Sequence, residues 1–190
     1  LRLGIPVPIR VSQNKIEGKC IVVTGHNLFA LEELLKQTEG KGINIYTHSE
    51  MLPAHGYPAL KKYSHLKGNI GKAWYDQRRL FEKFPGAILA TTNCVMPIKG
   101  TYADRMFTYE VVGLENVEKI VNDNFSPLIS RALELPEAAM ASEETLLTGF
   151  HHETVLGIAP EVIEAVKDGK IKRFFVIAGC DAPGHGGDYY

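Results

Sequence analysis

Short apolar runs alternate along this chain with segments whose apolar residues recur at helical spacing. The runs K-C-I-V-V-T at residues 19–24 and I-N-I-Y-T at residues 43–47 are rich in β-branched residues, which predicts two buried strands. Between them, leucines at positions 28, 31, 34 and 35 predict an amphipathic helix that begins after Asn27 and ends at Gly40. This order of strand, helix and strand predicts a parallel βαβ unit.

The same alternation continues to the end of the chain. Residues 1–10 are predicted to be an extended lead-in, and residues 136–149, where the periodicity is weak, are predicted to separate two units. Further strands are predicted at 87–92, 105–109 and 173–178, and further helices at 70–84, 117–121, 127–135 and 160–168.

We therefore predict an α/β fold in two parts. Residues 1–145 should form a Rossmann-like three-layer domain with a mainly parallel sheet, which would bind the cofactor. Residues 146–190 should form a partial second α/β unit, made of the first helix, strand and cysteine loop of a following, truncated domain.

Four of the predicted strands are followed at once by a side chain that could bind a metal. They end in T-G-H-N, T-H-S-E, T-T-N-C and A-G-C-D, which supply His26, Glu50, Cys94 and Cys180. Because the carboxyl ends of parallel strands lie at one edge of a sheet, these residues could converge. One imidazole, one carboxylate and two thiolates suit a site with soft and hard metal positions, such as iron bridged by sulfur and oxygen. The paired C-x-x-C spacing of a zinc ribbon is absent from the sequence.

Each candidate also has an ordinary structural interpretation. His26 could bond a backbone group at a strand–helix turn, Glu50 could pair with a lysine at the surface, and Cys94 could be a small core residue. Cys180 lies in a glycine-rich turn, where a role in core packing is less suitable.

Three neighbouring residues complete the set of candidates. Cys20 lies inside the first predicted strand, so we predict that it is a buried core residue. His48 and His55 flank Glu50 and could orient its carboxylate through hydrogen bonds, or they could be exposed residues of the turn.

Composition and charge exclude several classes of protein. The 190 residues are 45% hydrophobic and 23% charged, as in an ordinary globular protein, and the net charge of -1 provides no basic field for nucleic acid. No apolar run reaches membrane-spanning length, and no signal-peptide pattern is present. Three cysteines, an odd number, argue against a secreted disulfide framework, so a cytoplasmic location is predicted. The chain begins at Leu1 rather than Met, so we expect it to be a fragment of a longer protein.

Four strings in the chain carry a resemblance to a known family. In order, V-T-G-H-N, T-H-S-E-M-L-P-A-H-G-Y-P, F-P-G-A-I-L-A-T-T-N-C and F-F-V-I-A-G-C-D resemble the hybrid-cluster proteins, also called prismane proteins or hydroxylamine reductases. The resemblance runs along nearly the whole chain and is most specific in E-M-L-P-A-H-G-Y-P and T-T-N-C. It implies a hybrid iron–sulfur–oxygen cluster of the 4Fe-2S-2O type between two Rossmann-like domains, with His26, Glu50, Cys94 and Cys180 among its ligands.

The chain also departs from the family pattern. It has G-H-N where the family has G-H-D, and A-G-C-D where the family has G-G-C-D. The family's N-terminal helical domain, which holds a second iron–sulfur cluster, is missing, and so are two later cysteines and a second glutamate of the hybrid cluster. We expect this fragment, the middle domain and the start of the third, to bind no cluster by itself and to be inactive.

The resemblance implies a function for the full-length parent. It would be an oxidoreductase of nitrogen metabolism that reduces hydroxylamine to ammonia and water, or a related nitrogen oxide such as nitric oxide. Its partners would be this small substrate and an electron donor protein, with no nucleic acid and no membrane; the oligomeric state is left open.

Two other function classes remain open. The first is a Rossmann-like nucleotide- or phosphate-binding module without redox metal, which would use G-C-D-A-P-G-H-G-G at residues 179–187 as a phosphate loop. No G-x-G-x-x-G follows the first strand and no Walker pattern is present, which argues against this alternative. The second is a structural zinc or interaction domain. Analysis of the metal in protein made without oxygen would separate all three.

Overall fold

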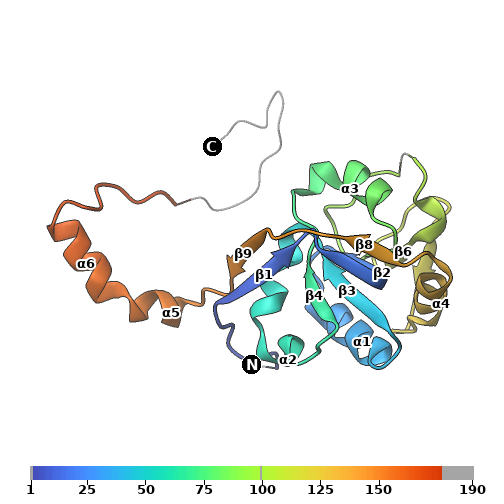
Figure 1. Ribbon diagram of the computed structural model, residues 1–190, viewed down its shortest axis with the longest axis horizontal. Helices are drawn as coiled ribbons and strands as arrows, with labels where there is room; N and C mark the ends of the chain where they lie inside the picture. The colour runs from blue at the N-terminus through green and yellow to red at the C-terminus, as the bar shows by residue number, and fades with distance from the viewer. Residues whose placement is uncertain (1, 99, 177–190) are drawn as a thin grey trace. The chain divides into compact units, whose positions relative to one another are not determined.

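The computed structural model describes residues 2–98 and 100–176, and the chain divides into two compact units, Leu1–Phe150 and His151–Tyr190. The first unit contains a mostly parallel sheet with helices on both faces (Figure 1), which confirms the predicted Rossmann-like α/β fold. Its strands are β1 (Ile9–Gln13), β2 (Ile16–Thr24), β3 (Ile43–Thr47), β4 (Leu66–Asn69), β5 (Ala87–Ala90), β6 (Met106–Tyr109), β7 (Glu118–Ile120), β8 (Ala138–Met140) and β9 (Thr145–Thr148). Its helices are α1 (Leu28–Thr38), α2 (Pro58–Lys61), α3 (Gln77–Lys83) and α4 (Ser126–Glu134), with the 3-10 segments η1 (Ser49–Gly56), η2 (Trp74–Asp76) and η3 (Ala103–Arg105).

The order of the strands places three strand ends side by side at the centre of the sheet. The order is β7-β6-β5-β2-β3-β4-β1-β9, and β8 pairs with the first residues of β2. β2 is parallel to β3 on one side, with Val23 opposite Thr47, and parallel to β5 on the other, with Thr24 opposite Ala90. The predicted βαβ unit is therefore confirmed, and the residues after β2, β3 and β5 leave the sheet at the same edge.

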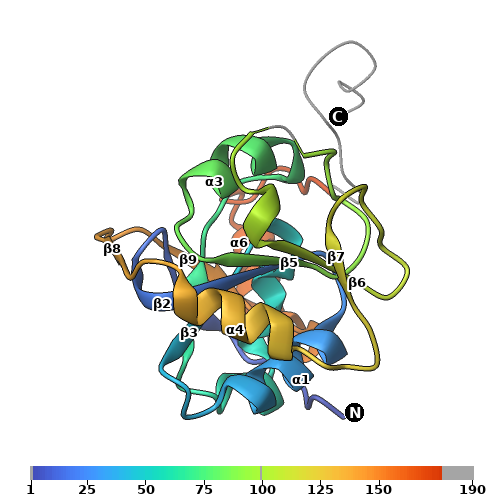
Figure 2. The ribbon, with the colours of Figure 1, turned by 90° about the vertical axis from the view of Figure 1, so that its right-hand side faces the viewer.

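The core has two layers, one on each face of the sheet. Alternate side chains of β2 point to opposite faces, so Ile21 and Val23 pack with α1 and α4, whereas Cys20 and Val22 pack with α3. Figure 2 shows α1 and α4 on one side of the strands and α3 on the other. α1 begins where its sequence predicts, because the Asn27 side chain accepts hydrogen bonds from the first N–H groups of the helix.

Two predicted helices differ from the structure. Residues 118–120 form β7, which pairs with β6 in parallel; the prediction of a helix at 117–121 was wrong, because pairing with β6 outweighs a pattern too short to hold a helix. The helix predicted from residue 70 begins only at η2 and α3. Gly71 and Lys72 have φ angles of 72° and 64°, and this left-handed backbone cannot continue a right-handed helix.

Several short strands were not predicted, including β4, for which no element was expected. β1 lies partly within the predicted lead-in, and β8 and β9 lie within the segment 136–149. β9 pairs antiparallel with β1 in the first unit, so the predicted boundary between residues 145 and 146 crosses this strand. The assignment of the later residues to a following domain stays a prediction.

The second unit contains α5 (His152–Gly157) and α6 (Ala159–Lys167), and α6 confirms the helix predicted at 160–168. Residues 173–176 are not in a strand, and the rest of the strand predicted at 173–178 lies outside the described residues. The physical reason is that, in the described part of this unit, no neighbouring strand pairs with these backbone groups.

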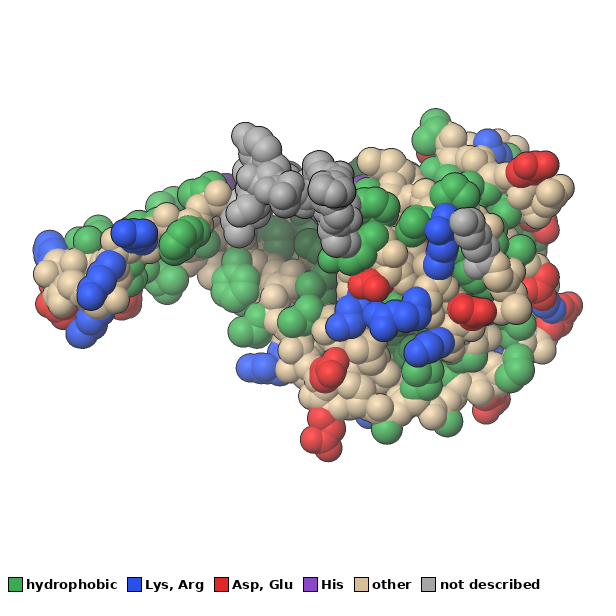
Figure 3. Space-filling model, turned by 90° about the horizontal axis from the view of Figure 1, so that it is seen from above, with side chains coloured by type: hydrophobic (Ala, Val, Ile, Leu, Met, Phe, Trp, Pro, Cys, Tyr) green, Lys and Arg blue, Asp and Glu red, His purple; other side chains and the backbone are tan. Residues whose placement is uncertain are grey.

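None of the described residues of the second unit is buried. Figure 3 shows hydrophobic side chains along its surface, at the left of the view, and the exposed ones include Leu156, Phe174 and Phe175. On the visible face of the first unit, charges of both signs are interspersed. Among the described helices, none has the length and apolar character needed to cross a membrane.

Candidate metal centre

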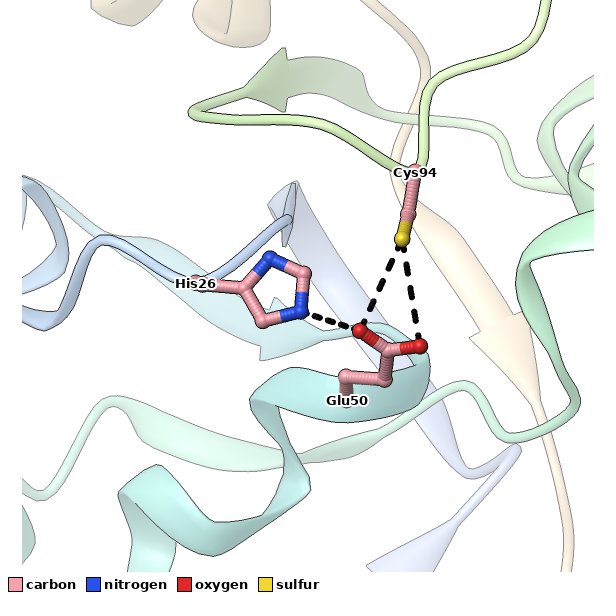
Figure 4. A group of neighbouring side chains, drawn as sticks. All are labelled: His26, Glu50 and Cys94. Atoms are coloured by element: carbon pink, nitrogen blue, oxygen red, sulfur yellow. Dashed lines mark hydrogen bonds and ion pairs between the residues drawn. The ribbon is translucent and has the colours of Figure 1, made fainter. Parts of the chain in front are cut away.

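His26, Glu50 and Cys94 meet at the carboxyl-terminal edge of the sheet, just beyond β2, β3 and β5 (Figure 4). One donor atom from each lies within 4.8 Å of the others. His26 Nε2 contacts Glu50 Oε2, and Cys94 Sγ lies 3.6 Å and 3.9 Å from the two oxygens of the same carboxylate. The predicted convergence of these three side chains is confirmed. Their role as cluster ligands stays a prediction, and Cys180 lies outside the described residues.

Each donor is carried by a turn with left-handed backbone. The φ angles are 105° at Gly25, before His26, 51° at Ser49, before Glu50, and 65° at Cys94 itself. At Gly25, an added Cβ would lie 2.5 Å from Thr91 Oγ1 and 2.7 Å from a backbone nitrogen of the β5 turn, so the turns after β2 and β5 can approach only because this residue is glycine. A left-handed conformation at a residue other than glycine costs of order 1–2 kcal/mol, so the surrounding structure must hold it.

Thr92 orients the imidazole of His26. The Thr92 Oγ1 atom accepts a hydrogen bond of 2.8 Å from the His26 backbone N–H and lies 2.9 Å from His26 Nδ1. Nε2 therefore points toward Glu50. If Nδ1–H donates to Thr92, Nε2 is free to bind a metal at this position.

The chemistry of the three donors fits iron in a mixed environment. Imidazole nitrogen and thiolate sulfur suit iron and iron–sulfur clusters, and a carboxylate adds a harder oxygen donor. The His26 and Glu50 side chains are 42% and 32% exposed, so the described residues form an open, one-sided set. Such a set requires further ligands to enclose a cluster.

The contacts of His26, Glu50 and Cys94 go beyond those of ordinary structural residues. His26 does bond at the strand–helix turn, but it also contacts Glu50, and Glu50 pairs with His26 rather than with a lysine. Cys94 is half-buried and lies outside the core, whereas Cys20 is 1% exposed in the middle of β2. Burial raises the pKa of Cys20 to about 12, so its thiol stays protonated and the prediction that it is a core residue is confirmed.

His48 and His55 are both buried, so the idea that they are exposed turn residues was wrong. His48 Nδ1 lies 2.9 Å from Thr24 Oγ1, and His55 Nε2 lies 2.9 Å from Thr47 Oγ1. Burial lowers the pKa of each imidazole to about 4, so both are neutral at pH 7. The hydrogen bonds described for Glu50 go to His26 and Cys94. The two buried histidines instead contact the threonines that end β2 and β3.

We expect the stability of the chain to fall as the pH is lowered from about 6.5 to about 4, in part because of His55. Its pKa is depressed in the folded state, so the unfolded chain binds the proton more tightly, and acid favours unfolding by up to about 3 kcal/mol. His55→Gln should reduce the slope of unfolding free energy against pH, measured by urea denaturation, by up to about 1.4 kcal/mol per pH unit in this window. The control His152→Gln, at an exposed histidine, should leave the slope unchanged.

A cavity of about 430 Å³ lies beside Cys94. Its walls are the turn after β5 and the loop after β6. They contain Thr92, Asn93, Cys94, Val95, Val111, Val112, Gly113 and Leu114. The sequence prediction identified only Cys94 in this cavity, because a loop such as 111–114 carries no motif and reaches the site only through the pairing of β6 with β5.

Comparison with known proteins gives a consistent result. A profile of the Prismane/CO dehydrogenase family matches residues 1–190. The chain is 53% identical over 189 residues to a hydroxylamine reductase of Moorella thermoacetica, 52% over 187 residues to one of Methanothermobacter thermautotrophicus, and 55% over 188 residues to one of Geobacter sulfurreducens. These matches cover 98% to 100% of this chain but only 44%, 44% and 34% of the three relatives. The chain therefore spans less than half the length of the curated relatives it matches.

Proposed function

This chain belongs to the Prismane/CO dehydrogenase family, and on that premise we propose that it is part of an iron–sulfur oxidoreductase that reduces hydroxylamine to ammonia and water. The alternative substrate in this proposal is a related nitrogen oxide such as nitric oxide. The observation that carries the proposal is the convergence of His26, Glu50 and Cys94, whose nitrogen, oxygen and sulfur donors lie within 4.8 Å of one another. The similarity to hydroxylamine reductases over the whole chain supports the same reaction.

The cofactor of this proposal is a hybrid iron–sulfur–oxygen cluster of the 4Fe-2S-2O type. His26, Glu50, Cys94 and Cys180 would hold it, together with residues of the longer protein. The cluster would supply electrons and an open coordination position for the substrate. The chain's own residues set the geometry: Thr92 orients His26, and the turn at Cys94 directs the sulfur toward Glu50.

The remaining parts of the proposal concern the longer protein. A second iron–sulfur cluster in another domain and a separate electron donor protein would deliver the electrons, in the cytoplasm and as part of nitrogen metabolism. Residues 1–145 would be the cluster-binding domain, and residues 146–190 would begin the next domain. The exposed apolar side chains of α5 and α6 support this division, because such a surface needs neighbours to cover it.

The test is to purify the full-length protein without oxygen. We expect iron and acid-labile sulfide, the electron paramagnetic resonance spectrum of a hybrid cluster, and turnover of hydroxylamine with a reduced dye as electron donor. Zinc alone would indicate a structural site, and tight nucleotide binding without iron would favour the nucleotide-binding alternative; either result would contradict the proposal.

We expect the 190-residue chain by itself to hold no stoichiometric hybrid cluster after reconstitution with iron and sulfide under argon. The described donors lie on one side of an open site, and iron positions without protein ligands are exposed to water and oxygen. The measurement is iron per chain and hydroxylamine turnover, with a small ferredoxin as control. A full complement of cluster, or turnover above that of the ferredoxin, would show that the missing ligands matter less than we propose.

A further inference from the structure

Gln77, the first residue of α3, is a buried polar residue that the sequence prediction did not single out. Gln77 is only 2% exposed, and buried polar groups require hydrogen-bond partners. Its Nε2 donates to the backbone carbonyl of Cys94, and its Oε1 accepts a hydrogen bond of 3.1 Å from the backbone N–H of Met96. One amide thus bridges the turn that carries Cys94.

This bridge acts on a turn that needs support. Cys94 has a φ angle of 65°, a conformation that residues with a side chain rarely adopt. The amide of Gln77 bonds a carbonyl and the N–H two residues later, as a neighbouring strand would, and so favours this one conformation of the turn. In that conformation Cys94 Sγ lies 3.6 Å from Glu50 Oε2.

The contacts of Gln77 continue to the other two turns of the site. Its Nε2 also lies 3.4 Å from Thr24 Oγ1, and Thr24 Oγ1 lies 2.9 Å from His48 Nδ1. Thr24 is 1% exposed and His48 is fully buried. Thr24 ends the strand before His26, and His48 precedes the turn of Glu50, so one buried network reaches the turns of all three candidate ligands.

We propose that Gln77 is a positioning residue that holds the Cys94 sulfur in place for the cluster, and that Thr24 and His48 extend this support to the turns of His26 and Glu50. The inference rests on the proposed function. The positioning role requires both polar atoms of the Gln77 amide, because Nε2 must donate to a carbonyl while Oε1 accepts from an N–H.

The chain offers a matched control in Gln37 of α1. Its amide makes the same kind of bridge on another loop: Nε2 donates to the backbone carbonyl of Asp123 at 2.7 Å, and Oε1 accepts from the backbone N–H of Phe125 at 3.2 Å. Asp123 also has left-handed backbone, with a φ angle of 54°, and its loop carries none of the candidate ligands. Gln77→Met and Gln37→Met therefore remove equivalent bridges, and only the first one touches the site.

The first experiment compares these variants in the full-length protein made without oxygen. We expect both to lower the melting temperature. Only Gln77→Met should weaken iron binding, by about 10- to 100-fold, as loss of supporting hydrogen bonds does at metal sites, and only it should change the paramagnetic resonance spectrum of the cluster. If Gln77→Met does not fold, Gln77→Glu keeps the size of the side chain and an acceptor for Met96 but loses the donor to Cys94, and it should change the spectrum in the same way.

The second experiment does not depend on the cluster. In metal-free protein, the alkylation rate of each cysteine by iodoacetamide is followed by mass spectrometry of its peptide, with buried Cys20 as internal standard. Gln77→Met should raise the rate at Cys94 severalfold and Gln37→Met should not. The inference would be overturned if Gln77→Met kept the spectrum, the iron affinity and the alkylation rate of the wild-type protein. It would also be overturned if Gln37→Met had effects equal to those of Gln77→Met. If the wild-type protein binds no iron, the proposed function fails, whereas the alkylation rates still decide whether Gln77 positions Cys94.

Discussion

Cys94→Ala in the full-length protein is expected to remove the hybrid-cluster spectrum and to lower hydroxylamine turnover by about 100-fold or more. Loss of a supporting partner of a ligand already costs 10- to 100-fold in metal affinity or activity, and Cys94 is proposed to be a ligand itself. Its sulfur is the soft donor that the described part of the site places beside Glu50 and His26. The measurements are iron per chain, the paramagnetic resonance spectrum and the turnover rate of protein purified without oxygen.

Cys20→Ala is the matched control for this variant. Cys20 carries the same functional group but is 1% exposed and packs in the core on the α3 face of the sheet. We expect a modest loss of stability from the smaller side chain, with the cluster spectrum unchanged. A cluster that survives Cys94→Ala and disappears in Cys20→Ala would show that the wrong thiol has been assigned.

Gly86→Ala is expected to lower the free energy of unfolding by about 3 kcal/mol or more, because the added methyl group has no space. A Cβ at this position would lie 2.0 Å from the backbone oxygen of Cys20 and 2.6 Å from its sulfur, so β5 would have to move away from β2. The carbonyl of Gly86 also accepts a hydrogen bond of 2.6 Å from the buried guanidinium of Arg105, which anchors the start of β5. Urea denaturation measures the loss.

Gly86→Ala should also disturb the candidate metal site, because the spacing of β2 and β5 sets the distance between the turns of His26 and Cys94. Gly157→Ala is the control: an added Cβ there meets no atom within 4 Å, and we expect a change within about 0.5 kcal/mol. If Gly86→Ala and the unaltered chain unfolded at the same midpoint urea concentration, β2 and β5 would have to adjust to the added methyl group at little cost in free energy.

The sequence by itself determined the elements whose signals are local. The strand at residues 43–47 has the predicted bounds, and α1 begins directly after Asn27. Both follow from a short apolar run or a helical period and from the residue that caps it, all within a few positions of one another. The rule that parallel strands end at one edge then predicted that His26, Glu50 and Cys94 converge, without any knowledge of their distances.

Only the tertiary structure decided the features that depend on distant residues. β7 forms because β6 lies beside it. β9 forms because it pairs with β1, although more than 130 residues separate Thr148 from Ile9 along the chain. The burial of His48 and the bridge from Gln77 to Cys94 arise when helix α3 packs beside the strand ends, and no local pattern in the sequence predicts either of them. The physical reason is that strand pairing and buried hydrogen bonds join residues far apart in the chain, whereas periodicity and capping report only on neighbours.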